Sequence, residues 1–436
     1  MSTPYRRCDT AEADIGMRYY LSGADGTGGR LKTEPEDFVV DEISVRPEPK
    51  ESGKHVIATV TTRNWETNRL VRLLARNLGI SKEKIGFAGT KDKRGITTQL
   101  MSFECPMEKM SLIDLKDVEI KDAYVGRRGL QIGDLVGNSF RIRVKECDAS
   151  AEEIPGILDS VYTDIKKNGG FPNYFGVQRF GVVRPVTHRV GEWIVRGDFE
   201  KAVRCYLSAP STFENEESAA ARRELSERDD WKELLTIMPE SLSFEKILVG
   251  HLSDRPGDWI GAIDQLPRNL QMMFVHAYQS YLFNMMLSER IGRGIPLNAP
   301  IVGDVVIPLD SNKIPLHENP IITTAANIDL VTRQVRAGRA FVTISLYGSD
   351  STFADGEMGE IEREIIEKES IEGKDFVVPG LSHCSSKGSR REIICPVNNL
   401  SYEMEDVGYI VSFSLPKGNY ATCLMREFMK SEMNRY

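Results

Sequence analysis

Alternating apolar and polar residues dominate the first 150 positions of the chain. Residues 38–45 and 54–62 are rich in β-branched and aromatic side chains, which is typical of strands. The period then changes, because apolar residues recur at helical spacing between Asn64, an expected N-cap, and Gly79, an expected C-terminal stop. Further strands are predicted at residues 97–103 and within 118–145. Strands and helices that mix without a regular βαβ repeat indicate an α+β domain.

The middle of the chain has a mainly helical pattern. Residues 269–290 predict a long amphipathic helix, whose stripe of Tyr and Met side chains we expect in the core. The other expected helices are residues 151–167, 190–207, 212–233 and 421–433. Strand patterns return at residues 301–309, 341–346 and 408–415. A length of 436 residues likewise favours more than one domain.

Composition narrows the class of protein. With 41% hydrophobic and 28% charged residues, the chain is close to an average globular protein, which excludes collagen, a disulfide scaffold and wholesale disorder. The sequence has neither a long apolar run nor the apolar region of a secretory signal, so we expect no membrane association. Its seven cysteines are scattered without a CxxC pair, which predicts reduced thiols and a cytoplasmic location.

The charge is unevenly distributed along the chain. A net charge of −8 argues weakly against nucleic acid as a partner. Residues 82–145, however, hold 13 Lys and Arg against 9 Asp and Glu, whereas residues 213–231 are acidic. An acidic protein can therefore still present a basic groove to a phosphate backbone.

The densest polar cluster is residues 86–99, GFAGTKDKRGITTQ. Its single carboxylate, Asp92, lies among Lys91, Lys93 and Arg94, and neighbouring cations favour the ionised form. An ionised carboxylate on a loop whose glycines allow close approach of a ligand can act as a nucleophile or a general base. The alternative interpretation is a solvated basic hairpin loop with a turn stabilised by Asp92.

Three known enzyme motifs do not fit this cluster. A phosphate-binding P-loop requires GxxxxGK[ST], and the stretch has only GxxGTKD. An aspartyl-phosphate loop would place Asp92 at the end of an apolar strand, and it would have threonines where Arg94 and Ile96 stand. The glycine fingerprint of a dinucleotide-binding fold is absent.

The cluster does resemble the aspartate motif of the TruD-type tRNA pseudouridine synthases. Four other stretches are similar to motifs of this family in the same order: residues 32–42 (KTEPEDFVVDE), 137–142 (GNSFRI), 172–181 (PNYFGVQRFG) and 413–427 (FSLPKGNYAT, running on to RE). Residues 277–284 (AYQSYLFN) resemble part of the inserted domain of the family. The similarity spans residues 32–427, and each motif is long and irregular, so the set is highly specific.

The resemblance implies an activity and a partner. Members of the family isomerise uridine to pseudouridine in tRNA, typically at position 13, by detaching the base from C1′, turning it and rejoining it through C5. The reaction requires no cofactor and no metal, and the six histidines form no recognisable zinc motif. The implied partner is tRNA, with no membrane and no protein partner.

The resemblance also implies roles for individual residues. Asp92 would be the nucleophile, attacking either the pyrimidine ring or C1′, and we expect it to be buried beside Lys32. A uridine taken out of its stack needs an aromatic face and hydrogen bonds to its edge. The implied substrate-binding residues are Lys32, Phe38, Asn138, Phe140 and Phe413. Alternatively, Phe140 and Phe413 are plain core residues and Asn138 serves a turn.

A basic strip is expected to contact the RNA backbone. It comprises Lys82, Lys84, Lys91, Lys93 and Arg94, with Arg141 and Arg143 nearby. Arg179, in QRFG beside an aromatic pair, is expected either to contact RNA or to form a salt bridge. The acidic residues 213–231 should face away from RNA.

The family fold implies a discontinuous architecture. Residues 1–171 and 392–436 would form an α+β catalytic domain with a mixed or antiparallel sheet, and residues 172–391 an inserted α/β domain. Two other classes remain open: a catalytically silent RNA-binding protein of the same fold, and a magnesium-dependent aspartyl-phosphate phosphotransferase.

Overall fold

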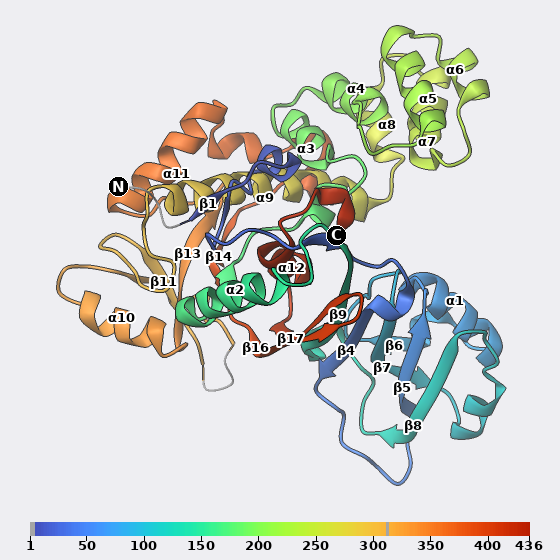
Figure 1. The fold of residues 1–436 in the computed structure, drawn as a ribbon. Coiled ribbons are helices and arrows are strands. Elements are labelled where there is room, and N and C mark those ends of the chain that lie inside the picture. Colours follow the sequence, from blue (N-terminus) through green and yellow to red (C-terminus); the bar gives the residue numbers. More distant parts are fainter. Residues whose placement is uncertain (1–4, 311–313) are drawn as a thin grey trace. The chain divides into compact units, whose positions relative to one another are not determined.

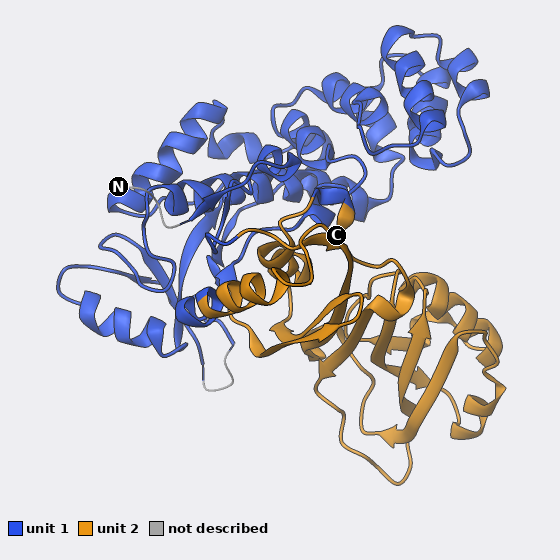
Figure 2. Cartoon of the chain, in the orientation of Figure 1, with its two compact units in different colours: residues 1–24, 164–394, 432–434 blue, residues 25–163, 395–431, 435–436 orange. Residues whose placement is uncertain are grey.

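The computed structural model describes residues 5–310 and 314–436. The chain divides into two compact units, each built from segments that are distant in sequence (Figure 2). Unit 1 comprises residues 1–24, 164–394 and 432–434, and unit 2 comprises residues 25–163, 395–431 and 435–436. The middle segment of unit 1 extends beyond the expected limits of 172 and 391 at both ends. The limits of the functional domains stay a prediction.

The first residues of the chain pack with unit 1, not with the segment that follows them. The amide of Asn284 donates to the carbonyl of Ile15 at 3.1 Å, and the hydroxyl of Ser288 donates to the carbonyl of Gly16 at 2.5 Å. Both polar side chains are buried on one long helix, so these bonds satisfy groups that would otherwise be costly to bury.

Unit 2 is built on a nine-stranded mixed sheet (Figure 1), which confirms the predicted fold class. Its central strand order is β16-β17-β9-β4-β7-β5-β8, with β3 paired to β9 and β6 to β7. The strands are β3 (Gly28–Arg30), β4 (Phe38–Ser44), β5 (His55–Arg63), β6 (Ile85–Phe87), β7 (Ile96–Glu104), β8 (Val118–Gly126), β9 (Leu135–Cys147), β16 (Asn398–Glu405) and β17 (Gly408–Pro416). Strand β4 runs parallel to β7 and antiparallel to β9.

One face of this sheet is covered by helix α1 (Thr67–Leu78). Leu70, Leu74 and Leu78 pack on buried residues of β5 and β7, as expected for an amphipathic helix. Gly79 ends the helix in the left-handed conformation, as predicted. The predicted N-cap was wrong, because Glu66 accepts the first free amides. Asn64 instead adopts a φ of 60° and accepts a bond from the amide of Gly95.

The remaining helices of unit 2 pack near the other end of the sheet. Helix α2 (Ile154–Asn168) begins in unit 2, where Tyr162 contacts the ring of Tyr402 at 6.2 Å. Helix α12 (Ala421–Met429) is shorter than predicted, because Lys430 adopts a left-handed conformation with a φ of 46°. The buried hydroxyl of Thr27 joins the carbonyl of Phe428 to the hydroxyl of Tyr409, which ties α12 to β17.

Unit 1 is mainly helical around a four-stranded antiparallel sheet of order β12-β11-β13-β14. Its helices are α3 (Thr187–Val195), α4 (Phe199–Ser208), α5 (Glu216–Glu227), α6 (Trp231–Ile237), α7 (Ser243–Asp254), α8 (Trp259–Asp264), α9 (Arg268–Gly292), α10 (Ile328–Arg336) and α11 (Gly356–Glu369). Its strands are β1 (Arg6–Arg7), β2 (Tyr19–Tyr20), β10 (Phe171–Pro172), β11 (Val305–Pro308), β12 (Ile321–Ile322), β13 (Ala340–Leu346) and β14 (Ser389–Glu392), and β15 (Ile394–Cys395) spans the unit boundary.

Two helices predicted in unit 1 are each broken in two. The predicted helix 190–207 is α3 and α4, because Gly197 adopts a φ of 72° between them. The predicted helix 212–233 is α5 and α6, where Asp230 begins a new helix by accepting the amide of Glu233. The long helix predicted at 269–290 is α9, whose Tyr278, Met285 and Met286 are buried as expected. Within the described ranges, no helix combines the length and the apolar character needed to cross a bilayer.

Candidate active site

The candidate site lies on the face of the unit 2 sheet that α1 covers. Side chains two residues apart on a strand share a face, so Phe38, Val40 and Glu42 of β4 point to the same side. Register pairs Val40 with Phe140 and Glu42 with Asn138 of β9, and Phe140 in turn with Phe413 of β17. Strand pairing therefore brings three separate motifs of the sequence onto one surface.

Lys32 and Asp92 form an ion pair at the edge of this surface. The ammonium nitrogen of Lys32 lies 3.3 Å from Oδ2 of Asp92. Lys32 adopts a φ of 58°, a left-handed conformation that a lysine seldom adopts, and its side chain is only 13% exposed. Asp92 is 52% exposed, so the expectation of a buried carboxylate was wrong. Its loop between β6 and β7 leaves one side of the carboxylate open to solvent.

Three phenylalanines continue inward from this ion pair. The ammonium of Lys32 lies 4.2 Å from the ring centroid of Phe38, a cation–π distance. Phe38 meets Phe140 edge-on at 6.3 Å, and Phe140 stacks on Phe413 at 5.2 Å. All three rings are buried, and Phe140 retains the most exposed surface at 8%. All three rings are therefore core residues, and Phe140 is the least buried of them.

Asn138 and Glu42 lie opposite each other on β9 and β4. Oδ1 of Asn138 is buried and has no hydrogen-bond partner among the described residues. Oε1 of Gln99, on β7, is also buried without a partner in this part of the chain. Buried polar atoms are nearly always paired in folded proteins, and exceptions are frequent at functional sites. Asn138 therefore has an unused acceptor, on the face that carries Phe140.

Lys91 points away from solvent, toward Glu42. Its ammonium is bonded to the Glu42 carboxylate, and the two side chains are 5% and 0% exposed. Glu42 also accepts the amide of Leu100 and the hydroxyl of Ser44, and the backbone amide of Lys91 donates to the hydroxyl of Thr67. The predicted contact of Lys91 with the RNA backbone is therefore wrong, because its charge is buried and neutralised. Sequence reasoning missed Glu42, although it ends the motif at residues 32–42.

A hollow of about 430 Å³ adjoins the Lys32–Asp92 pair. Lys32, Thr33, Glu34, Pro35, Asn64, Lys93 and Arg94 line it. Lys93 and Arg94 are exposed, as a phosphate contact requires. Lys82 and Lys84 are exposed too, but they lie in a separate 3₁₀ turn (Lys82–Lys84) and do not line the hollow. The hollow thus groups Lys93 and Arg94, but not Lys82 and Lys84, with Lys32, the ion-pair partner of Asp92.

Arg143, expected near the basic strip, belongs to an internal charge network. Its guanidinium lies 2.5 Å from Glu405 and 3.3 Å from Asp37, and Lys145 lies 3.0 Å from Asp37. Burial would raise the pKa of Asp37, but a backbone bond from Glu34 and the two cations more than offset it, so its pKa is lowered. Arg143 is therefore not a free cation for RNA.

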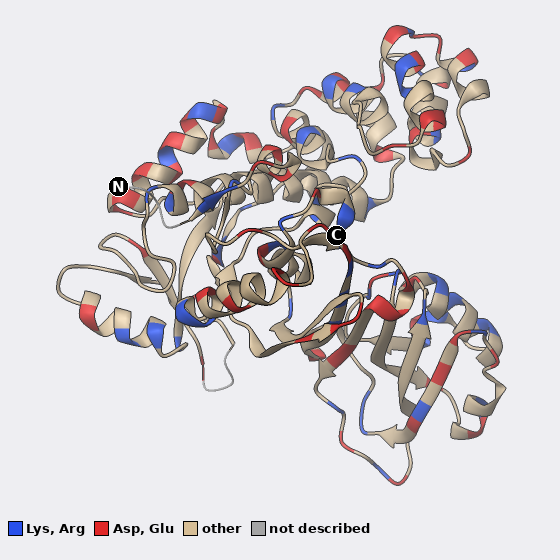
Figure 3. Cartoon of the chain, in the orientation of Figure 1, with Lys and Arg blue, Asp and Glu red and all other residues tan. Residues whose placement is uncertain are grey.

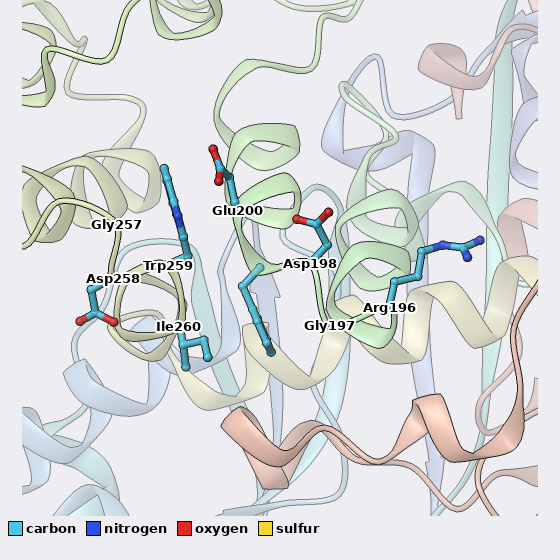
Figure 4. Close-up of a pocket in the computed structure, with 9 residues that line it drawn as sticks. Arg196, Gly197, Asp198, Glu200, Gly257, Asp258, Trp259 and Ile260 are labelled. Atoms are coloured by element: carbon cyan, nitrogen blue, oxygen red, sulfur yellow. The ribbon is translucent and has the colours of Figure 1, made fainter.

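A second hollow, of about 490 Å³, lies in unit 1 between α4 and α8 (Figure 4). Arg196, Asp198, Glu200 and Asp258 give it a charged lining. Asp198 and Asp258 accept backbone amides of Lys201 and Gly261, and these bonds cap the two helices. The carboxylates of Asp198 and Asp258 therefore stabilise the starts of α4 and α8. None of the predicted site residues lines this hollow.

The acidic segment 213–231 is partly neutralised by ion pairs within unit 1. Arg222 pairs with Glu214, Arg223 with Glu216, and Arg228 with Glu224 and Glu233. Figure 3 shows acidic and basic residues interspersed on α5 and α6. No group of three or more His, Cys, Asp or Glu side chains in the described part of the chain is arranged to hold a metal ion.

Comparisons with known proteins agree with the motifs. The family model for tRNA pseudouridine synthase D (TruD) matches residues 14–428. Relatives from Methanococcoides burtonii and Pyrococcus furiosus, each named "Probable tRNA pseudouridine synthase D", are 42% and 37% identical. The first match covers 97% of both chains, and the second covers 96% of this chain and 99% of the relative.

A solved structure supports the same assignment. The crystal structure named "Putative tRNA pseudouridine synthase D (TruD)" from Methanosarcina mazei superposes with a TM-score of 0.87 at 39% identity, covering 98% of this chain and 100% of that one. The predicted enzyme class, an isomerase of the tRNA pseudouridine synthases, is confirmed by these relatives. The chain belongs to the tRNA pseudouridine synthase D (TruD) family.

Proposed function

We propose that this protein converts uridine to pseudouridine in tRNA, at position 13, with Asp92 as the nucleophile. The observation that carries the proposal is the ion pair of 3.3 Å between Lys32 and an otherwise exposed Asp92, beside a basic hollow. A carboxylate that is oriented by a cation and still open on one side can reach a substrate atom. The cytoplasm is the proposed location, in keeping with seven free thiols.

The reaction is an isomerisation and balances within one nucleotide. The bond from C1′ to N1 breaks, the base turns, and a bond from C1′ to C5 forms. The proton lost from C5 is matched by the proton gained at N1, so no other group needs to be transferred. Asp92 would attack either the pyrimidine ring or C1′, and the proposal leaves both routes open.

The neighbouring residues support the base while it turns. Phe140 presents its edge, and Asn138 its unused acceptor, for the uracil ring and its N–H groups. Phe38 and Phe413 hold Phe140 in place, and Lys32 orients the carboxylate. Lys93, Arg94, Lys82 and Lys84 would contact phosphates. These roles need no cofactor.

One experiment separates this function from its alternatives. The full chain and its Asp92→Asn variant are incubated with uridine-containing tRNA in the presence of a metal chelator, and pseudouridine is mapped by nucleotide position. Pseudouridine at position 13, formed by the wild type alone, supports the proposal. A silent RNA-binding protein would bind tRNA and form no pseudouridine, and a phosphotransferase would require magnesium.

A further inference from the structure

The motif PNYFGVQRFG at residues 172–181 lies in unit 1, whereas the residues of the candidate site described above lie in unit 2. Its arginine, Arg179, ends a short 3₁₀ turn (Val177–Arg179). The salt bridge considered from the sequence is absent, since Arg179 forms no ion pair among the described residues. Its Nε atom is buried and has no hydrogen-bond partner in that part of the chain. Burying part of a guanidinium without a hydrogen-bond acceptor raises the free energy of the folded state, so such a residue in a folded protein is expected to have a function.

The surroundings of Arg179 are rigid. The guanidinium lies 5.7 Å from the ring centroid of Phe175, whose other close cation is Arg391 at 4.3 Å. The backbone of Phe175 is fixed by the buried Asn284, which accepts its amide at 2.9 Å and donates to its carbonyl at 3.0 Å. Arg391 is held differently, because it donates to Oδ1 of Asn173 at 2.7 Å. Arg179 is thus pre-positioned on an aromatic ring but has no ion pair within the described part of the chain.

The local electrostatic environment is positive. Partial desolvation lowers the pKa of His276, although the residue is exposed, and the charge of Arg179 lowers it further. Burial likewise lowers the pKa of His188 to about 3, with a smaller contribution from Arg189. Both imidazoles are therefore neutral, and Arg189 is exposed without an ion pair among the described residues. An anion brought to Arg179 would meet a cation that has no ion pair among the described residues.

We propose that Arg179 binds a phosphate of the tRNA backbone, so that unit 1 has an RNA contact of its own. A guanidinium is the side chain that suits phosphate best, because its planar donors match two phosphate oxygens. The ring of Phe175, 5.7 Å away, limits where the guanidinium can lie. The choice of tRNA as the ligand rests on the proposed function. An unpaired arginine beside an aromatic ring would suit a free phosphate equally well. The test below distinguishes a phosphate of tRNA from free inorganic phosphate.

The test measures tRNA binding in the full-length Asp92→Asn protein over a series of salt concentrations. Adding Arg179→Gln should weaken binding roughly tenfold at about 0.1 M salt and make the log–log salt slope shallower by about 0.7 to 0.9, the value for one phosphate contact. Arg179→Lys keeps the charge, so its slope should stay within error of the parent. Arg223→Gln is the matched control, since it removes an exposed arginine of unit 1 that Glu216 already neutralises. It should leave both quantities unchanged.

Three outcomes would overturn the inference. The first is wild-type affinity and slope in Arg179→Gln. The second is weaker binding with an unchanged slope and a lower melting temperature in both Arg179 variants, which would mean a packing role. The third is a result showing that Arg179 binds free anions and not tRNA. In that case inorganic phosphate would raise the melting temperature of the parent but not of Arg179→Gln, and Arg179→Gln would bind tRNA as the parent does. Pseudouridine mapping with the wild type is run separately, so a failure of the proposed function is seen independently of Arg179.

Discussion

The ammonium of Lys91 is bonded to the carboxylate of Glu42, with both side chains buried, while the next residue in the chain, Asp92, is 52% exposed. Neighbouring residues of one loop therefore face opposite ways. Glu42 belongs to β4, whose position is fixed by β7 and β9 on its two sides. The buried pair anchors the loop to the sheet and leaves Asp92 pointing outward toward Lys32.

Removing one partner of this buried pair should destabilise the protein and slow the reaction. Glu42→Gln leaves the buried Lys91 without a counter-charge, which typically costs roughly 3–5 kcal/mol. We expect a lower free energy of unfolding by urea denaturation and a lower kcat, because the Asp92 loop loses its anchor. Adding Lys91→Met should recover part of the stability. A stability equal to wild type in Glu42→Gln would contradict the anchoring role.

Asp92→Asn should abolish pseudouridine formation and leave folding and tRNA binding largely intact. The amide has nearly the shape of the carboxylate but is not a nucleophile. Because Asp92 is half exposed, the change should cost little stability. Position-resolved pseudouridine mapping checks activity, and thermal melting checks the fold. Turnover close to wild type would contradict the mechanism.

Lys32→Met should lower kcat more than it raises KM. The methionine retains most of the side-chain volume over Phe38 but removes the ammonium 3.3 Å from Asp92. The carboxylate would then lose the contact that orients it, which matters most in the chemical step. Single-turnover kinetics on saturating tRNA measure this directly. A variant with unchanged single-turnover rates would mean that the ion pair is incidental.

Replacing Lys82 and Lys84 together by Ala should make the salt dependence of tRNA binding shallower. Both residues are exposed, and each phosphate contact contributes about 0.7 to 0.9 to the log–log slope, so the change should be about 1 to 2. The control is Lys54→Ala with Lys121→Ala, because Glu104 and Glu119 lie 3.4 and 2.9 Å from these lysines, closer than the 3.9 Å between Lys82 and Glu83. Equal slopes in both double variants would mean that residues 82–84 are only a solvated surface.

The stability of the protein should fall with acid in a way that depends on His188. Burial lowers its pKa in the folded state to about 3 from 6.5, so below pH 6.5 the unfolded chain binds a proton that the folded chain does not. The free energy of unfolding then decreases by about 1.4 kcal/mol per pH unit until about pH 3. At pH 4.5 the loss from this residue is roughly 3 kcal/mol. In His188→Phe, the new ring retains the edge-on contact with Phe180 and the stack on Tyr281, and urea denaturation between pH 7 and 4.5 should show a correspondingly shallower loss of stability.

Local features of the chain were readable from the sequence. The strands β4 and β5 and the helix α1 follow from the change between a period of two and a helical period, because side-chain alternation is a property of the backbone itself. The ends of helices were less predictable. Gly79 was correctly expected as a stop, whereas Asn64 was not the cap, because its side chain is used by Gly95 across the loop.

In the candidate site, too, some features could be predicted from the sequence and others could not. Asp92 stood out by its cluster of charges, and the motif around it is specific enough to indicate the family from the residues alone. The sequence could not distinguish Lys91 from Lys93, since both lysines flank Asp92. Only the pairing of β4 with β7 and β9 determines that Glu42 lies beneath the loop and neutralises one of them. In the same way, Arg179 could have had a carboxylate partner, and only the tertiary structure leaves it without one. Which charged groups are present follows from the amino-acid order alone, whereas their burial and pairing depend on residues far away in the chain that folding brings together.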